Sequence, residues 1–178
     1  MGGELYFFVE RGGASEVYVY SVDGTLVRQF TVPIHPTTQP VLGAFTGEAL
    51  ELAIVGGGQV GVYTVYGEEQ WRHTQEEIYA IQGLAAGDIN GDGQVELLHT
   101  VGDTLSILDG DGGETVFEDA EGSDAVTHWM YPQIVDVDGD GWTELVVSHQ
   151  RAGGEGGPSL SLYSRLTNGW VHNEDCTD

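Results

Sequence analysis

Hydrophobic and polar residues alternate along most of this chain, in short runs separated by glycine-rich turns. Strict alternation places every second side chain on one face, as in a half-buried β-strand. Four runs show it most clearly: EVYVY (16–20), VGVYTVY (60–66), TLSIL (104–108) and SLSLY (159–163). Each is followed by a turn and a more polar strand; the turns lie at Asp23-Gly24, Tyr66-Gly67, Asp109 to Gly113 and Asn168-Gly169. Asp-Gly and Asn-Gly pairs favour type I′ hairpin turns.

A second set of apolar runs precedes these hairpins: LYFFV (5–9), LELAIV (50–55), VELLHTV (95–101) and ELVVSH (144–149). Three of them follow a further short segment: QPVLGAF (39–45), IQGLAAGDI (81–89) and YPQIVDV (131–137). A glutamate opens the second strand of these three units, at Glu51, Glu96 and Glu144, so the spacings are 45 and 48 residues. Four strands in a period of this length are typical of a β-propeller blade.

The sequence therefore predicts an all-β fold, a single β-propeller domain of about four antiparallel four-stranded blades. Their approximate ranges are 1–35, 36–78, 79–125 and 126–178, and the first blade lacks its leading strand. The chain either closes a small four-bladed ring or contributes half of a larger ring with a partner copy. An incomplete first blade leaves an exposed strand edge, to be covered by another subunit or by GWVHNED (169–175). For TQEEIYAIQG (74–83) we expect strand and loop rather than a helix capped by Thr74.

Two nonapeptides in these repeats carry candidate chemistry: DINGDGQVE (88–96) and DVDGDGWTE (136–144). Each places oxygen-bearing side chains at positions 1, 3, 5 and 9, glycines at positions 4 and 6, and a backbone carbonyl at position 7. Calcium prefers six to eight hard oxygen ligands in a forgiving geometry. Close carboxylates repel one another unless a cation lies between them. The spacing therefore favours a metal site over a simple acidic turn.

DINGDGQVELL (88–98) and DVDGDGWTELVV (136–147) resemble the FG-GAP/VCBS repeat family, the calcium-loop propeller blades of integrin α-subunits and many secreted microbial proteins. The resemblance implies that each loop joins the first two strands of a blade and binds one Ca2+. The implied ligands are Asp88, Asn90, Asp92, the Gln94 backbone oxygen and Glu96, and then Asp136, Asp138, Asp140, the Trp142 backbone oxygen and Glu144. The second unit reads AFTGEALE (44–51), one residue shorter and with Ala44 at position 1. We expect no calcium there, and two ions in total.

The charge is strongly negative. Twenty-nine acidic residues against five basic ones, all arginine, give a net charge of −24. A surface of this kind resembles proteins of extreme halophiles or their viruses, in which salt screens the repulsion; the alternative is an acidic extracellular protein that binds divalent ions. Nucleic acid and anionic membranes are poor partners for such a charge. The one cysteine, Cys176, cannot form an internal disulfide. No signal peptide and no apolar run of membrane-spanning length is visible.

These features predict a non-enzymatic structural module, or one that binds proteins, glycans or copies of itself. We place it in an extracellular, cell-surface or virion assembly at high salt. The alternative is a carbohydrate-active enzyme, a polysaccharide lyase or hydrolase, or a fragment of one, because paired carboxylates can cleave glycosides. The run GGGQVG (56–61) matches a dinucleotide-binding pattern, but a strand-like segment follows it where that motif needs a helix. Scattered histidines do not form a zinc motif.

Overall fold

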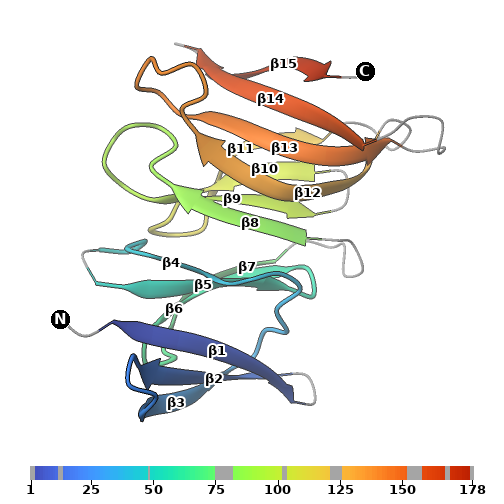
Figure 1. The fold of residues 1–178 in the computed structure, drawn as a ribbon. Helices are drawn as coiled ribbons and strands as arrows, with labels where there is room; N and C mark the ends of the chain where they lie inside the picture. The colour runs from blue at the N-terminus through green and yellow to red at the C-terminus, as the bar shows by residue number, and fades with distance from the viewer. Residues whose placement is uncertain are drawn as a thin grey trace.

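The computed structural model describes residues 3–11, 14–47, 49–74, 82–101, 104–120, 126–151, 158–166 and 169–176. Every regular element in these ranges is a β-strand, and the strands form four antiparallel sheets (Figure 1). The all-β prediction is therefore confirmed. The described residues contain no helix long and apolar enough to cross a lipid bilayer.

Each sheet is a simple meander in which strands adjacent in sequence pair. The first sheet contains β1 (Glu4–Arg11), β2 (Ala14–Ser21) and β3 (Leu26–Val32), and the second β4 (Val41–Gly43), β5 (Glu51–Gly56), β6 (Gln59–Thr64) and β7 (Glu69–Thr74). The third contains β8 (Gln82–Gly87), β9 (Glu96–Val101), β10 (Thr104–Leu108) and β11 (Thr115–Ala120). The fourth contains β12 (Val126–Val135), β13 (Glu144–Arg151), β14 (Pro158–Leu166) and β15 (Gly169–Cys176). Residues 75–81 lie outside the described ranges, so the expectation for 74–83 stays a prediction.

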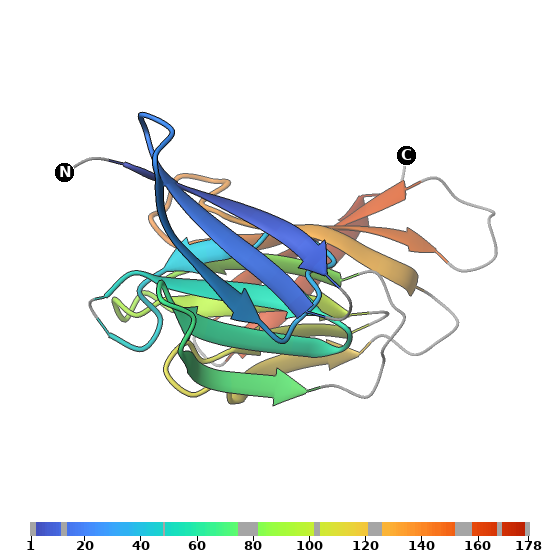
Figure 2. The same cartoon turned by 90° about the horizontal axis from the view of Figure 1, so that it is seen from below.

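The sheets pack face to face in chain order, and each interface contains one hydrophobic core (Figures 1 and 2). Strand β5 shows how one strand serves two cores. Leu52 and Ile54 pack toward the first sheet, whereas Ala53 and Val55 pack toward the third. Because both of its faces are buried, β5 reads as a continuous apolar run rather than an alternating one.

The first sheet has three strands, as the sequence predicted for the first unit. Its strand β1 begins with Glu4-Leu5, and β5, β9 and β13 also begin with Glu-Leu. Strand β1 therefore takes the place of a second strand, and no leading strand precedes it in the described sheet.

The sequence left two forms open, a closed four-bladed ring and half of a larger ring. The described sheets form an open series and do not close a four-bladed ring. The first and fourth sheets lie at opposite ends of the molecule (Figure 1). The expectation that 169–175 covers the edge of the first blade is wrong. This segment is β15, which pairs with β14 and completes the fourth sheet, because its backbone groups find a partner strand there.

Turn geometry differs from the type I′ expectation at the Asp-Gly hairpin. The Gly24 N–H donates to the Ser21 carbonyl, and the Ser21 N–H donates to the Thr25 carbonyl. This is the pattern of a three-residue loop with a glycine bulge, and Gly24 has φ of 84°. A two-residue hairpin with positive φ at both positions occurs instead at Gly57 and Gly58, between β5 and β6. The GGGQVG run is therefore a β-hairpin.

Neighbouring sheets are also joined by a repeated hydrogen bond near their outer strands. The Arg28 Nε–H in β3 donates to the Val65 carbonyl at 2.8 Å. The Trp71 indole N–H in β7 donates to the Gly110 carbonyl at 2.7 Å. By strand register Arg28 and Trp71 occupy equivalent positions. The two accepting carbonyls are also equivalent, because each lies two residues after the last buried residue of the strand before it. Different side chains thus make the same contact in successive sheets.

Candidate metal centre

The two predicted calcium loops connect the first and second strands of the third and fourth sheets. The carboxylate at position 1 folds each loop around itself. Asp88 accepts hydrogen bonds from the Gly91 and Gly93 N–H groups at 2.7 and 3.0 Å. Asp136 accepts the same pair from Gly139 and Gly141 at 2.7 and 3.0 Å. All four glycines have positive φ, between 75° and 91°, a conformation that side chains with a Cβ rarely adopt.

The glutamate at position 9 closes each loop by accepting a hydrogen bond from the backbone N–H at position 2. One oxygen of Glu96 accepts the Ile89 N–H at 2.8 Å, and one oxygen of Glu144 accepts the Val137 N–H at 2.8 Å. Both glutamates are buried. Burial raises the pKa of Glu96, and the negative charges of Asp92 and Asp88 raise it further, whereas the backbone hydrogen bonds oppose the shift. A cation in this loop would relieve the same repulsion.

The fourth-sheet loop gathers a compact set of carboxylates. Ligand oxygens of Asp136, Asp138 and Glu144 all lie within 4.8 Å of one another. With Ca–O distances of about 2.3–2.6 Å, two oxygens on opposite sides of an ion are at most about 5 Å apart. These three carboxylates therefore fit the coordination sphere of one Ca2+. Asp140 is not part of this close group, and its Oδ1 accepts the Trp142 N–H at 2.8 Å.

Position 3 distinguishes the third-sheet loop from the fourth. The Asn90 amide nitrogen donates to Asp92 at 2.9 Å and to Glu96 at 3.0 Å, while its oxygen accepts the Asp92 N–H. An amide N–H is a donor and not a metal ligand. In the fourth-sheet loop, Asp138 offers a carboxylate at this position and accepts the Asp140 N–H at 3.1 Å. At position 3, the third-sheet loop thus has an amide that donates hydrogen bonds, whereas the fourth-sheet loop has a carboxylate that can only accept them.

The shortened loop of the second sheet is held by hydrogen bonds to Glu51, as the third-sheet loop is held by hydrogen bonds to Glu96. The expectation that this loop binds no calcium stays a prediction. Glu51 accepts the Phe45 and Thr46 N–H groups at 2.9 and 2.7 Å. The Thr46 hydroxyl donates to its other oxygen at 2.5 Å. Thr46 stands at position 3, so its hydroxyl donates to the glutamate at position 9 as the Asn90 amide does in the third-sheet loop. Thr46 was not among the residues predicted from the sequence, although a hydroxyl at position 3 of the shortened loop can be read there.

The two predicted calcium loops also touch each other. A Cβ on Gly91 would lie 2.8 Å from a ring carbon of Trp142, so the indole packs directly against the third-sheet loop. The Thr143 hydroxyl, next along the chain, donates to the Ile89 carbonyl at 3.4 Å. The sequence predicted only a backbone role for Trp142, because nothing in a single sequence shows which loop its ring meets.

A buried histidine lies away from these loops, in the middle of β9. His99 is 1 % exposed, and both of its ring nitrogens lack a hydrogen-bond partner. Burial lowers the pKa of His99 to about 3, and the nearby His73 adds to the shift. A neutral imidazole in such a place acts as part of the packing.

Comparison of the sequence with family models and with curated proteins finds no match. Solved structures match this chain, and two of them are as follows. BamB from Moraxella catarrhalis, a propeller, has a TM-score of 0.55 and 12 % identity, over 95 % of this chain and 49 % of that chain. The V. cholerae biofilm matrix protein Bap1 has a TM-score of 0.47 and 21 % identity, over 74 % of this chain and 28 % of that chain. The chain thus spans half or less of the length of these two proteins, and the likeness to BamB concerns the fold alone.

Proposed function

We propose that this chain is a calcium-stabilised β-propeller module that serves a structural or interaction role in an extracellular or virion-surface assembly at high salt. The observation that carries the proposal is the carboxylate group Asp136, Asp138 and Glu144, held in a loop between two strands of a packed sheet. The calcium in this proposal fixes loop conformation. Its ligands belong to an acidic loop in which Asp140 accepts a hydrogen bond from the loop's own backbone, at the Trp142 N–H.

Propeller geometry is supported by the contacts between sheets. The first strands of successive sheets lie against one another, β4 with β8 and β8 with β12, as inner strands do around a propeller axis. The fold likeness to BamB, which covers nearly the whole chain, points the same way. The described residues make an open arc, so a complete ring needs further blades.

A binding role is favoured over carbohydrate cleavage by the groove on the first sheet. It is lined by Leu5, Phe7, Tyr18, Tyr20 and Gly24, none of which carries a carboxylate. A glycosidase needs two carboxyl groups at a defined separation across the substrate. An apolar, aromatic groove suits adhesion to another surface instead.

Calcium counting tests the proposal. In molar KCl, the wild-type protein should bind two ions per chain, and Asp136→Ala or Asp88→Ala should each remove one. Asp111→Ala, which changes an exposed acid in the β10–β11 turn, is the matched control and should keep both. Chelator should lower the melting temperature by roughly 5–10 °C for each ion held at a hundredfold excess over its Kd. An unchanged melting curve together with no bound calcium would sink the calcium role.

The salt adaptation has its own readout. Between 0.1 M and molar KCl the Debye length falls from about 10 Å to about 3 Å. Repulsion among the 24 excess negative charges should therefore weaken, and the melting temperature should rise with salt. A melting temperature that falls or stays constant over this range contradicts the halophilic interpretation.

A further inference from the structure

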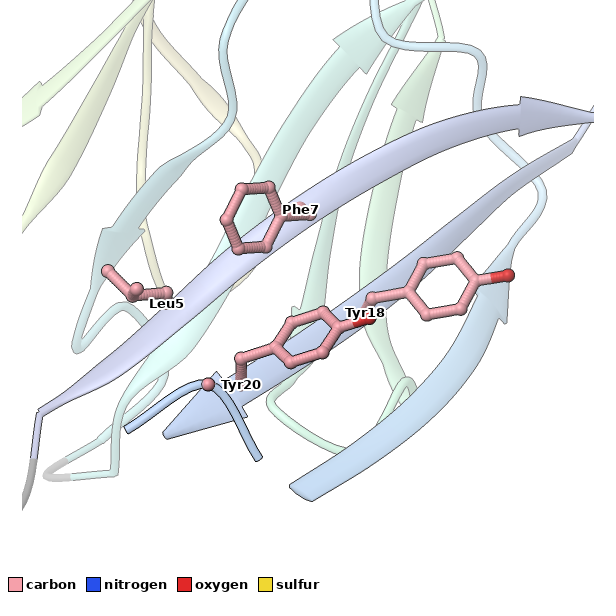
Figure 3. A pocket seen from close by; sticks show the side chains of 5 residues that line it. Leu5, Phe7, Tyr18 and Tyr20 are labelled. Atoms are coloured by element: carbon pink, nitrogen blue, oxygen red, sulfur yellow. The ribbon is translucent and has the colours of Figure 1, made fainter. Parts of the chain in front are cut away.

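The outer face of the first sheet exposes a row of large apolar side chains. Leu5 and Phe7 on β1 lie beside Tyr20 and Tyr18 on β2, and together with Gly24 they line a groove of about 530 Å³ (Figure 3). Leu5 is 50 % exposed and Phe7 52 %. The Phe7 and Tyr20 rings meet edge to face with centroids 5.6 Å apart, so these two side chains pack against each other within the face.

The repeat shows what this face corresponds to in the other sheets. Aligning the Glu-Leu pairs that open β1, β5, β9 and β13 makes Leu5 equivalent to Leu52, Leu97 and Leu145. Those three leucines are 0–1 % exposed, and each faces the sheet that precedes its own. Leu5 therefore occupies a position that every later sheet buries against a preceding sheet.

Strand register extends the equivalence to the tyrosine. Leu5 pairs with Tyr20, as Leu52 pairs with Tyr63 and Leu145 pairs with Tyr163. Tyr63 and Tyr163 are at most 1 % exposed, whereas Tyr20 is only partly buried. The first sheet thus carries the residues of a sheet-to-sheet interface on a face that the described chain leaves open.

The fourth sheet presents the complementary half of such an interface. Leu160 and Leu162 in β14 pair with Ser148 and Val146, on the face opposite the core residues of the fourth sheet. Their register equivalents in the first three sheets are 0–2 % exposed and pack against the sheet that follows; these are Val17, Val19, Val60, Val62, Leu105 and Ile107. Leu160 itself is 41 % exposed.

We infer that two copies of this chain associate head to tail, with the first-sheet groove of each copy packed on the outer face of the fourth sheet of the other. This inference rests on the interaction-module function proposed above and names its partner. Continuity favours a second copy as the partner, because equivalent positions make all three interfaces between the described sheets. The number two follows from the fold comparison, in which the chain covers 49 % of a propeller chain, so that two copies match one ring.

Such a contact is heterologous, because it joins two different faces, and it closes when the rotation between copies completes the ring. Each copy carries a net charge of −24, so association should need salt. At about 10 mM salt the Debye length of about 30 Å leaves the repulsion between copies largely unscreened, whereas at molar salt it acts over about 3 Å.

Light scattering after size exclusion, in molar KCl with calcium, tests the inference. The wild-type protein should have twice the mass of one 19.1 kDa chain. Phe7→Gln and Leu160→Gln should each weaken the dimer by at least about tenfold. Both residues are substantially exposed within the chain, so both variants should keep the wild-type circular dichroism. Val116→Gln is the matched control, since Val116 is a 61 % exposed strand residue on the third sheet, and it should remain dimeric.

Mixing the variants identifies the faces. Phe7→Gln retains an intact fourth sheet and Leu160→Gln an intact first sheet, so the mixed dimer keeps one of its two contacts unaltered. It should therefore form at a lower protein concentration than the dimer of either variant alone. A wild-type monomer at molar salt, or a dimer unaffected by Leu160→Gln, overturns the inference. Chelator melting of the same samples separates the two proposals: a monomer that still loses stability with chelator refutes self-association while leaving the calcium role standing.

Discussion

The buried imidazole of His99 should give this protein a specific acid sensitivity. The folded state holds His99 with a pKa of about 3 because burial penalises its charged form, whereas an unfolded histidine titrates near 6.5. Below pH 6.5 the unfolded chain binds a proton that the folded chain does not. The stabilisation is thus fully present above pH 6.5 and is lost as the pH falls toward 3.

The slope follows from the linkage relation. Each pH unit between 6.5 and 3 should lower the free energy of unfolding by about 1.4 kcal/mol. At pH 5.5 the loss is therefore about 1.4 kcal/mol, which for a chain of this size lowers the melting temperature by roughly 3–6 °C.

The substitution His99→Leu isolates this effect from the titration of the many carboxylates. Both proteins share the acidic groups, so the difference between their unfolding free energies reports His99. Leucine has a similar size and no polar atom to leave without a partner, so at pH 7.5 the variant should be at least as stable as the wild type. Below pH 6.5 the variant should gain about 1.4 kcal/mol per pH unit relative to the wild type.

Denaturant unfolding in molar salt at half-unit pH steps from 5 to 8 measures both curves. His35→Gln serves as a control, because it removes another histidine and leaves His99 in place. A difference between wild type and His99→Leu that stays constant across this range would refute the reasoning. It would mean that the imidazole is hydrated or partnered in solution.

Three further predictions follow from the loops and the turns. Asp138→Asn should weaken calcium binding in the fourth-sheet loop by about tenfold, because it puts an amide at the position that Asn90 occupies in the third-sheet loop. Asn90→Asp should conversely strengthen calcium binding in the third-sheet loop. Calorimetric titration that ranks the affinities otherwise would contradict the role of position 3. Trp71→Phe should destabilise the fold by about 1–3 kcal/mol in denaturant unfolding, because the buried Gly110 carbonyl loses the indole N–H as its donor. An unchanged unfolding midpoint would show that this hydrogen bond between sheets does not contribute to stability. Gly113→Ala should destabilise more than Gly24→Ala in thermal melting, since both glycines have positive φ but only at Gly113 would a Cβ meet Trp71, at 2.5 Å; equal losses would show that backbone strain alone matters.

Local alternation and turn residues were enough to predict the strands. Runs such as TLSIL (104–108) match β10 residue for residue. Alternation with a period of two indicates a half-buried strand, and a short apolar run between turn residues indicates a strand that is buried on both faces. The role of β1 was also visible, since LYFFV aligns with the apolar runs that form the second strands of the other units. Turn type was harder: the sequence Asp23-Gly24 suits both a type I′ turn and a bulged three-residue loop, and only strand twist and register choose between them.

The loops show the same division. The sequence by itself determined the oxygen spacing of DVDGDGWTE and DINGDGQVE, because a nine-residue loop places its own ligands locally. Only the tertiary structure decided that Asp136, Asp138 and Glu144 converge while the Asn90 amide ties the other loop, since hydrogen-bond direction depends on the folded backbone. It also decided that the sheets stack in an open series, leaving Leu5 and Phe7 uncovered by the described chain. Whether an apolar position is buried depends on what lies across from it, and a periodic sequence does not record where the series of sheets ends.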